Sequence, residues 1–331
     1  MTSESSLNKA RWKKWPIGLF VALIITLVSG ELFARYYLGL GDPPLFMADS
    51  EIEYLYQPSQ SVMRFGNRIQ YNAFSMRSDP FPKQKPDHEF LRVLVLGDSV
   101  INGGSLTDQD ELATEILKAR LSQELDGIVQ VGNISTGSWG PANLLAYIEK
   151  YGLFDADAVV LVISSQDATD VPTFTPRVGV SSSFPDQTPF FALQEAISRY
   201  LPRYLPSGGG HEKDQGKKPS HDEEDEFPAI SDLEALIKLV KDSQTPFVIL
   251  LHPTRDEVQM GYGPAYDAIV DAADRLDIDR LDFAPYLERY IQQGRTVYRD
   301  QIHPNASGQE ALAEALYASL EEAGVLVKEA E

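Results

Sequence analysis

The sequence predicts an α/β protein whose mostly parallel sheet is covered by helices on both faces. Short apolar runs that are typical of strands alternate along the chain with amphipathic stretches of helical length. This alternation is the pattern of repeated strand–helix–strand units, which place parallel strands side by side. Several of the runs are apolar at nearly every position, as expected for strands that are buried on both faces. A doubly wound sheet is therefore the expected core of the chain.

The expected elements follow one another between residues 91 and 325, which we predict to form one domain. Strands are predicted at 92–96, 128–131, 159–163, 247–251 and 278–283. Amphipathic helices are predicted at 111–123, 142–151, 233–241, 265–276 and 308–322. The first, third and fourth strands are almost entirely apolar, as expected for strands that are buried on both faces.

A long apolar segment lies near the N-terminus, from Ile17 to Tyr37. It is long enough for a helix that crosses a bilayer, which needs about 20 residues. Basic residues precede it, and such residues stay on the cytoplasmic side of a membrane; they are Lys9, Arg11, Lys13 and Lys14. We therefore predict a single-pass protein of the cytoplasmic membrane, with a cytoplasmic N-terminus at 1–15, a transmembrane signal anchor at 16–37 and an extracytoplasmic remainder.

A cleaved signal peptide is the alternative interpretation of this segment. The uncharged run from Ile17 to Gly30 has the length of a signal-peptide core. The best cleavage site, at Val28, Ser29 and Gly30, is poor, which favours the anchor. Both interpretations export the rest of the chain.

Two further segments differ from the strand–helix pattern. Residues 38–90 are predicted to be a juxtamembrane linker with a small β element, because Gly66 and Asn67 separate two short strand-like runs. Residues 207–226 are charged and almost free of apolar side chains, which predicts a disordered acidic loop. A metal-binding tract that uses His211 and His221 is the less favoured interpretation of that loop.

The composition excludes several classes of function. The formal net charge is −20 and the pI is about 4.6, so the chain repels nucleic acid, and we predict no nucleic-acid partner. The chain contains no cysteine, which excludes disulfides, thiolate metal sites and a thiol nucleophile. No metal-ligand spacing or phosphate-binding loop is present, so no metal and no cofactor are predicted.

Polar residues that suit acyl-transfer chemistry follow the predicted strands. Ligands bind at the carboxyl ends of the strands in an open parallel sheet. Ser99 follows the first strand in a Gly-Asp-Ser sequence, Gly137 follows the second, and Gln166 follows the third. A serine in such a turn can act as a nucleophile, and a glycine N–H or a glutamine amide can bind an oxyanion. Each residue alone is explained as well by a turn or a helix cap.

Asp300 and His303 stand just before the last predicted helix. Their spacing allows the carboxylate to orient the imidazole while the other ring nitrogen faces a serine. Of the five histidines, His88, His211 and His221 fall in the linker or the acidic loop, so His252 and His303 remain as candidate bases. His252 has no nearby acid upstream, and a hydrogen-bonded histidine at the rim of the site is its favoured interpretation.

Together these blocks resemble the SGNH (GDSL) hydrolase family. The resemblance implies a three-layer αβα, flavodoxin-like fold, and makes the domain at 91–325 an SGNH hydrolase-like catalytic domain. It implies Ser99 as the nucleophile, His303 as the base and Asp300 as the residue that orients it. The implied oxyanion hole consists of the Ser99 N–H, the Gly137 N–H and a side chain of the third block. The sequence departs from the family there, with Gln166 where an asparagine is usual, and Ser165 and Thr169 are possible helpers.

The resemblance and the anchor together imply a serine esterase that removes acyl groups, acetyl above all, from a polysaccharide of the cell envelope or outside it. An O-acyltransferase on such a polymer is the first alternative, since only the acceptor differs. A non-catalytic glycan-binding or assembly protein is the second, supported by the unusual Gln166. A phospholipase or thioesterase is a further alternative, although no apolar lid is evident in the sequence.

Overall fold

The computed structural model describes residues 4–86, 90–203 and 226–326. The loop predicted at 207–226 lies outside these ranges except for Glu226, and His88, His211 and His221 lie outside them as well.

A five-stranded parallel sheet forms the centre of the protein and confirms the predicted strands. Its strands are β5 (Phe90–Gly97), β6 (Ile128–Ser135), β7 (Ala158–Ile163), β8 (Phe247–Leu251) and β9 (Asp279–Asp282). They lie in the order β6-β5-β7-β8-β9. Counted along the chain this is the order 2-1-3-4-5, which is that of the flavodoxin-like fold. The α/β fold class predicted from the sequence is therefore confirmed.

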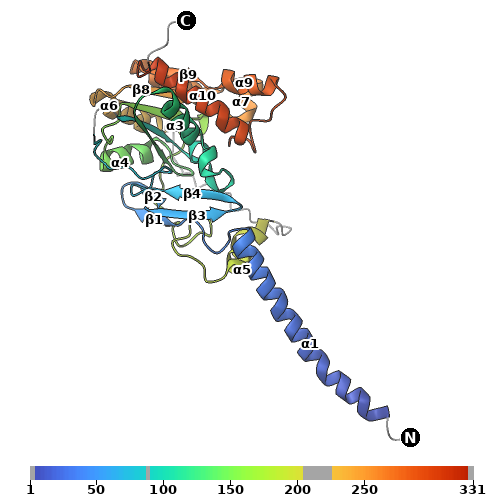
Figure 1. Cartoon of the computed structure of the whole chain (residues 1–331). Coiled ribbons are helices and arrows are strands. Elements are labelled where there is room, and N and C mark those ends of the chain that lie inside the picture. The colour runs from blue at the N-terminus through green and yellow to red at the C-terminus, as the bar shows by residue number, and fades with distance from the viewer. Residues whose placement is uncertain (1–3, 87–89, 204–225, 327–331) are drawn as a thin grey trace.

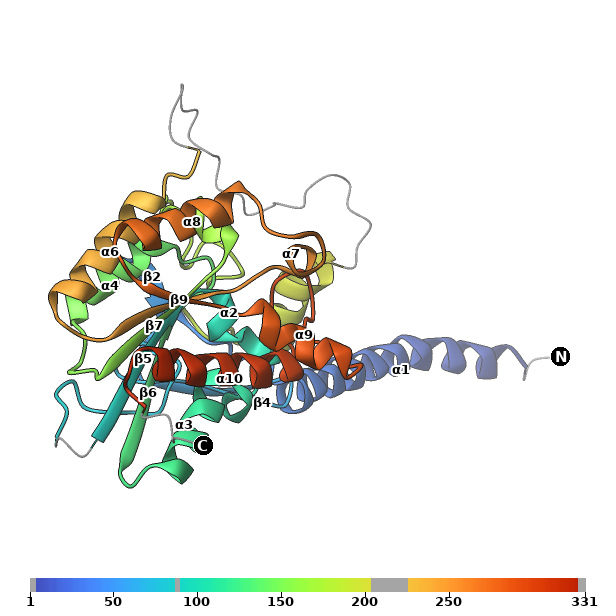
Figure 2. The same ribbon diagram turned by 90° about the horizontal axis from the view of Figure 1, so that it is seen from above.

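Helices cover both faces of the sheet (Figure 2). One face is covered by α4 (Pro141–Tyr151), α6 (Ile230–Asp242) and α8 (Pro264–Arg275), and the other by α3 (Ala113–Glu124), α9 (Ala284–Gln292) and α10 (Ala306–Glu322). Side chains of β5 alternate between the two cores, since Leu94 and Leu96 pack on the first face and Val93 and Val95 on the second. The result is a three-layer αβα arrangement.

Two antiparallel hairpins lie between the sheet and the N-terminal helix (Figure 1). They consist of β1 (Phe46–Asp49) with β2 (Glu53–Tyr56), and β3 (Gln60–Arg64) with β4 (Asn67–Tyr71). The hydroxyl of Tyr54 donates to the carbonyl oxygen of Gly137 at 2.9 Å, and the indole N–H of Trp139 donates to the carbonyl oxygen of Tyr54 at 2.9 Å. The first hairpin is thereby fixed to the loop that follows β6.

The N-terminal helix α1 (Glu4–Leu32) projects from the domain (Figure 1) and continues into a π-helical turn, η1 (Phe33–Tyr37). The 23 residues Trp15–Tyr37 are long and apolar enough to cross a membrane. The remaining elements are the helices α2 (Ser99–Asn102), α5 (Ala192–Glu195) and α7 (Arg255–Met260), the 3-10 turns η2 (Gly104–Leu106), η3 (Gln109–Glu111), η4 (Ser165–Ala168) and η6 (Leu201–Arg203), and the π turn η5 (Ala196–Tyr200).

Candidate active site

Ser99 stands where β5 ends and α2 begins, at the carboxyl edge of the sheet. Gly97 closes β5 tightly against β7, because a Cβ at this position would lie 2.9 Å from the carbonyl oxygen of Val162. The Asp98 side chain then accepts a 2.9 Å hydrogen bond from the N–H of Val100 and caps α2. The Gly-Asp-Ser sequence thus makes a tight turn that presents the serine hydroxyl at the end of the strand.

Asp300 and His303 lie on a short loop that is held closed by its own backbone. Tyr298 and Pro304 form an isolated β-bridge, and the N–H of Arg299 donates to the carbonyl oxygen of His303 at 3.0 Å. Within the loop, the Asp300 carboxylate accepts hydrogen bonds from the backbone N–H groups of Ile302, at 3.0 Å, and His303, at 2.8 Å. The acid and the imidazole are therefore oriented by local contacts.

The structure brings Ser99, His303 and Asp300 into one hydrogen-bonded chain. The Ser99 Oγ lies 2.9 Å from Nε2 of His303, and Nδ1 of His303 lies 2.8 Å from Oδ2 of Asp300. With the Nδ1 proton directed at the carboxylate, Nε2 is left to accept the serine proton. The Asp98 carboxylate is a second, more distant acceptor for the Ser99 hydroxyl, at 3.3 Å. The shorter contact thus runs to the imidazole.

The surroundings of Asp300 favour its charged form. Burial alone would raise the pKa of this carboxyl, but the backbone N–H groups of His303 and Ile302 and the His303 ring outweigh it, so the pKa lies below its usual range. Half of the Asp300 side chain is exposed, as is about a quarter of His303. A carboxylate that stays ionised beside Nδ1 can stabilise an imidazolium as it forms.

Arg299 joins the loop of His303 to the turn after Ser99. This bridge was not predicted from the sequence. Its guanidinium donates to the carbonyl oxygen of Gly103 at 3.1 Å and to the hydroxyl of Thr107 at 3.2 Å. Gly103 follows α2 directly. The two segments that carry Ser99 and His303 are therefore held together by a side chain that contacts neither of those side chains. The contact spans 196 residues of sequence, so no local pattern indicates it.

Gly137 lies beside Ser99, as expected for two oxyanion donors that act together. A Cβ built at Gly137 would lie 3.9 Å from the Cβ of Ser99. Among the described residues, no acceptor takes the backbone N–H of Ser99 or of Gly137. Both donors are therefore available to an oxygen atom that forms at the serine.

Gln166 is exposed on η4, the 3-10 turn that follows β7. Within the described ranges, no hydrogen bond joins its amide to Ser99, Gly137 or His303. The two helpers considered for it are engaged elsewhere. Ser165 donates to the carboxylate of Glu257, and the Thr169 hydroxyl donates to the carbonyl oxygen of Gln166 itself at 3.1 Å. The structure thus brings four of the predicted site residues together and leaves the Gln166 side chain apart from them.

Asp98, beside Ser99, is one of three carboxyl groups whose charges act on one another, with Asp167 and Asp170. Burial raises the pKa of Asp98, and burial together with the Asp98 charge raises the pKa of Asp167. Burial and Asp98 raise the pKa of Asp170 to about 6, against the opposing charge of Arg177. Asp167 also caps η4, since its carboxylate accepts from the backbone N–H of Ser164 at 2.7 Å. The three acids therefore resist ionisation.

His252 corrects an expectation from the sequence. It follows β8 as predicted, but it is 1% exposed rather than at a rim, and neither ring nitrogen has a hydrogen-bond partner among the described residues. Its ring packs against Phe283 and Tyr298, with centroids 5.4 and 6.0 Å away. Burial lowers its pKa to about 3. A hydrogen-bonded rim position is therefore wrong, because the ring is enclosed by aromatic neighbours.

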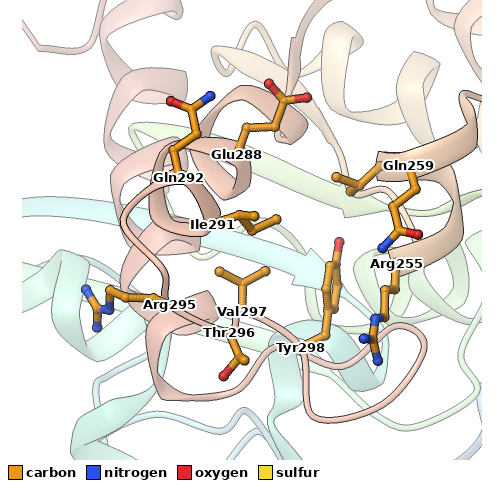
Figure 3. A pocket seen from close by; sticks show the side chains of 10 residues that line it. Arg255, Gln259, Glu288, Ile291, Gln292, Arg295, Thr296, Val297 and Tyr298 are labelled. Atoms are coloured by element: carbon orange, nitrogen blue, oxygen red, sulfur yellow. The ribbon is translucent and has the colours of Figure 1, made fainter.

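A small cavity lies beside Gly137, on the side of the hairpins, although neither Ser99 nor His303 lines it. It has a volume of about 180 Å³ and is lined by Gly137 and Ser138 after β6, by hairpin residues such as Phe46 and Tyr56, and by Arg199. A larger cavity of about 510 Å³ lies between α7, α9 and the 295–298 segment. Figure 3 shows Ile291 and Val297 at its centre, and neither Ser99 nor His303 lines it. The hydrogen-bonded chain, rather than cavity size, locates the candidate active site.

No group of three or more metal-ligating side chains is present within residues 4–86, 90–203 and 226–326.

No family model matches the chain, and no curated protein matches it either. Among solved structures, it is similar to a member of the lipolytic G-D-S-L family from Veillonella parvula, at 15% identity over 72% of this chain and 100% of that one, with a TM-score of 0.41. It is also similar to a lipase/acylhydrolase from Enterococcus faecalis, at 13% identity over 73% of this chain and 100% of that one, with a TM-score of 0.43. A third is an acetyl xylan esterase, at 15% identity over 70% of this chain and 100% of that one, with a TM-score of 0.41. Likenesses this distant say nothing of activity, which rests on the geometry of the site.

Proposed function

We propose that this protein is a serine esterase that removes acyl groups, acetyl above all, from a polysaccharide outside the cytoplasmic membrane. The hydrogen-bonded chain from Ser99 through His303 to Asp300 carries the proposal. A nucleophile, a base and a residue that orients the base are the parts that acyl transfer requires, and they are recognised by geometry. A binding module would have no need of all three in contact.

The mechanism follows from the positions of the atoms. Nε2 of His303 takes the proton of Ser99 as Oγ attacks the ester carbonyl, and the carbonyl oxygen becomes an oxyanion. The tetrahedral intermediate collapses, the C–O bond to the alcohol breaks, and His303 returns the proton to the departing oxygen. Water then attacks the acyl-enzyme, loses its proton to Nε2, and the acid is released as Ser99 regains its proton. Asp300 stays ionised throughout and stabilises the imidazolium.

The oxyanion is expected to bind the backbone N–H groups of Ser99 and Gly137. We include the Gln166 amide as a third donor that reaches the oxygen only when substrate is bound, since its side chain is exposed and free to rotate. Loss of one oxyanion donor typically costs about 100- to 1,000-fold in kcat. Gln166→Ala tests the assignment, with Gln166→Asn as the conservative variant. A kcat within twofold of wild type for Gln166→Ala would restrict the hole to the two backbone groups.

The cavity beside Gly137 supports a sugar as the alcohol part of the ester. Its lining combines aromatic rings with hydroxyl groups and one guanidinium. Rings such as Tyr56 offer apolar faces for a sugar, while Ser138 and Arg199 offer hydrogen bonds to its hydroxyl groups. The apolar helix with basic residues before it supports a position on the outer face of the cytoplasmic membrane.

The test uses the full chain in detergent with an acetyl aryl ester as substrate. We expect wild type to release the phenol, and Ser99→Ala and His303→Ala each to lower kcat by at least about 1,000-fold. Ser122→Ala, which changes an exposed serine on α3, serves as the matched control. Equal activity in wild type and in Ser99→Ala would reject the proposal. Release of acetate from acetylated xylan or mannan then tests the substrate class.

A further inference from the structure

Four large apolar side chains are exposed on one short segment, two of them just before α5 and two on η5 and η6. They are Phe190, Phe191, Ile197 and Leu201, with exposed fractions of 81, 54, 59 and 43%. We call them the 190–201 patch. Ile197 and Leu201 are four residues apart in helical turns, so they lie on one face. Single exposed apolar residues are ordinary, but four on one short segment, with the Phe190 and Phe191 rings 4.7 Å apart, indicate an interaction surface.

The patch is attached directly to the outer end of the N-terminal helix. The Glu31 carboxylate accepts hydrogen bonds from the backbone N–H groups of Ala192 and Leu193, both at 2.9 Å. The Arg35 guanidinium donates to the carbonyl oxygen of Phe190 at 3.0 Å and pairs with Glu31 at 2.8 Å. Figure 1 shows α5 beside this end of α1. The helix therefore fixes the position of the patch.

A second set of contacts makes this junction rigid. Ala34 and Leu40 of the chain after α1 form a buried cluster with Ala192 of α5. Nearby, the fully buried Arg64 of β3 pairs with Glu195 at the end of α5, and Glu195 also accepts from the N–H of Gly41 at 2.7 Å. The patch cannot move away from the helix without breaking a buried ion pair.

The length of the helix places the patch at the membrane surface. A bilayer core about 30 Å thick takes about 20 helical residues, at about 1.5 Å each. Counted from Trp15, such a span ends near Ala34, beside the Glu31–Arg35 pair. The exposed aromatic residues just beyond it, Tyr36 and Tyr37, have the composition of an interfacial belt. The backbone of Phe190 contacts Arg35, the residue just before Tyr36.

We propose that the 190–201 patch inserts into the outer headgroup and acyl boundary of the membrane that α1 crosses. The domain then rests on the bilayer by a second contact and has a fixed orientation. Arg199 stands between the two apolar residues of η5 and η6 and lines the cavity beside Gly137. The cavity is therefore lined in part by the segment that carries the patch. The esterase then acts on polymer that is held close to the membrane. This inference rests on the proposed membrane anchor.

The experiment uses the absence of cysteine from the chain. Single-cysteine variants of the full chain, each labelled with an environment-sensitive fluorophore, are placed in phosphatidylcholine nanodiscs. Phe190→Cys and Ile197→Cys report on the patch, and Ile24→Cys reports on insertion of α1. Met260→Cys is the control, because Met260 is 78% exposed on α7, which lies at the far end of the domain (Figure 1).

Lipids with a nitroxide near the headgroup are expected to quench the labels at 190 and 197 at least threefold more than the label at 260. Iodide in the aqueous phase is expected to quench the label at 260 more than the labels at 190 and 197. If position 24 is quenched by deep nitroxides while 190 and 197 behave like 260, the patch does not touch lipid and the inference is wrong. If position 24 is unquenched as well, the anchor itself fails, and the inference fails with it, whereas ester hydrolysis by Ser99 is judged separately.

Discussion

The guanidinium of Arg299 donates a 3.1 Å hydrogen bond to the carbonyl oxygen of Gly103, and so joins the loop of His303, the candidate base, to the turn of Ser99, the candidate nucleophile. Ser99 begins α2 and Gly103 directly follows its last residue, while His303 lies four residues after Arg299. The segments that form the 2.9 Å contact between Ser99 and His303 are therefore bridged by a side chain that contacts neither of the two side chains. In acyl transfer, such positioning matters because a misplacement of about 1 Å can cost about 100-fold in rate.

Arg299→Ala is expected to lower kcat by about 10- to 100-fold with little change in KM, because the loop of His303 loses its attachment to the turn after Ser99 while the cavity beside Gly137 stays intact. Steady-state kinetics with an acetyl aryl ester measure both constants. Arg299→Lys is expected to recover part of kcat, since an ammonium can still reach one of the two acceptors. Arg295→Gln is the control, because Arg295 lies on the same segment but pairs with Glu310 at 2.6 Å. A loss confined to KM or to thermal stability would contradict a positioning role.

Asp300→Asn is expected to lower kcat by about 1,000- to 10,000-fold. The asparagine would keep the shape of the loop, but it can donate to Nδ1 and so favours the wrong tautomer of His303, and it carries no charge to stabilise the imidazolium. The exposed Asp279, changed to Asn, is the control for loss of one negative charge. Turnover by Asp300→Asn within tenfold of wild type would show that the carboxylate does not serve the base.

The arrangement of the sheet could be predicted because its signals are local. The runs that became β5, β7 and β8 are apolar enough to identify buried strands, and parallel strands bring their carboxyl ends to one edge. Ser99 and Gly137 therefore had to lie near each other once β5 and β6 paired. Asp300 and His303 could be linked from their spacing alone, since the loop between them is short.

The rest depends on contacts between distant parts of the chain. The hydroxyl of Tyr54 meets the carbonyl oxygen of Gly137 across 83 residues, and nothing in the hairpin sequence specifies that loop. The burial of His252 likewise follows from where Phe283 and Tyr298 pack. Its position after a strand suggested the rim of the site, and nothing near it in the sequence indicates those aromatic neighbours. The direction of the Gln166 side chain could not be predicted either, because the rotation of an exposed amide depends on what binds beside it.

His252→Leu is expected to raise the free energy of unfolding by about 1 kcal/mol at neutral pH. Two buried ring nitrogens without partners are costly, and an apolar side chain of similar volume removes that cost. Below pH 6.5 the gain should grow. Because the pKa of about 3 in the folded state lies below that of the unfolded chain, the unfolded state binds the extra proton and wild-type stability falls as pH falls.

The pH-dependent part of this gain in the free energy of unfolding is on the order of 2 kcal/mol at pH 5. Chemical denaturation of the two proteins in the same detergent at pH 5 and pH 7.5 measures it, and the activity of His252→Leu on the aryl ester is measured in parallel. An equal stability difference at both pH values would mean that His252 titrates normally. A loss of activity as large as that of His303→Ala would show that the candidate base was assigned to the wrong histidine.

Asp170→Asn is expected to stabilise the protein at pH 7.5 by on the order of 2 kcal/mol, and to have a much smaller effect at pH 4.5. The sign is opposite to that for His252. Burial and the Asp98 charge raise the pKa of Asp170 to about 6, above the unfolded value of 3.8, so the folded state binds the proton more tightly and stability is lost as pH rises through about 6. Asparagine cannot ionise, so the variant keeps the stability that wild type loses. Thermal unfolding in detergent, measured from pH 4.5 to 7.5 beside wild type and Asp279→Asn, tests this. A stability difference that is constant across the range would show that Asp170 ionises as an exposed aspartate does, and that Asp98, Asp167 and Asp170 do not share one low-dielectric site.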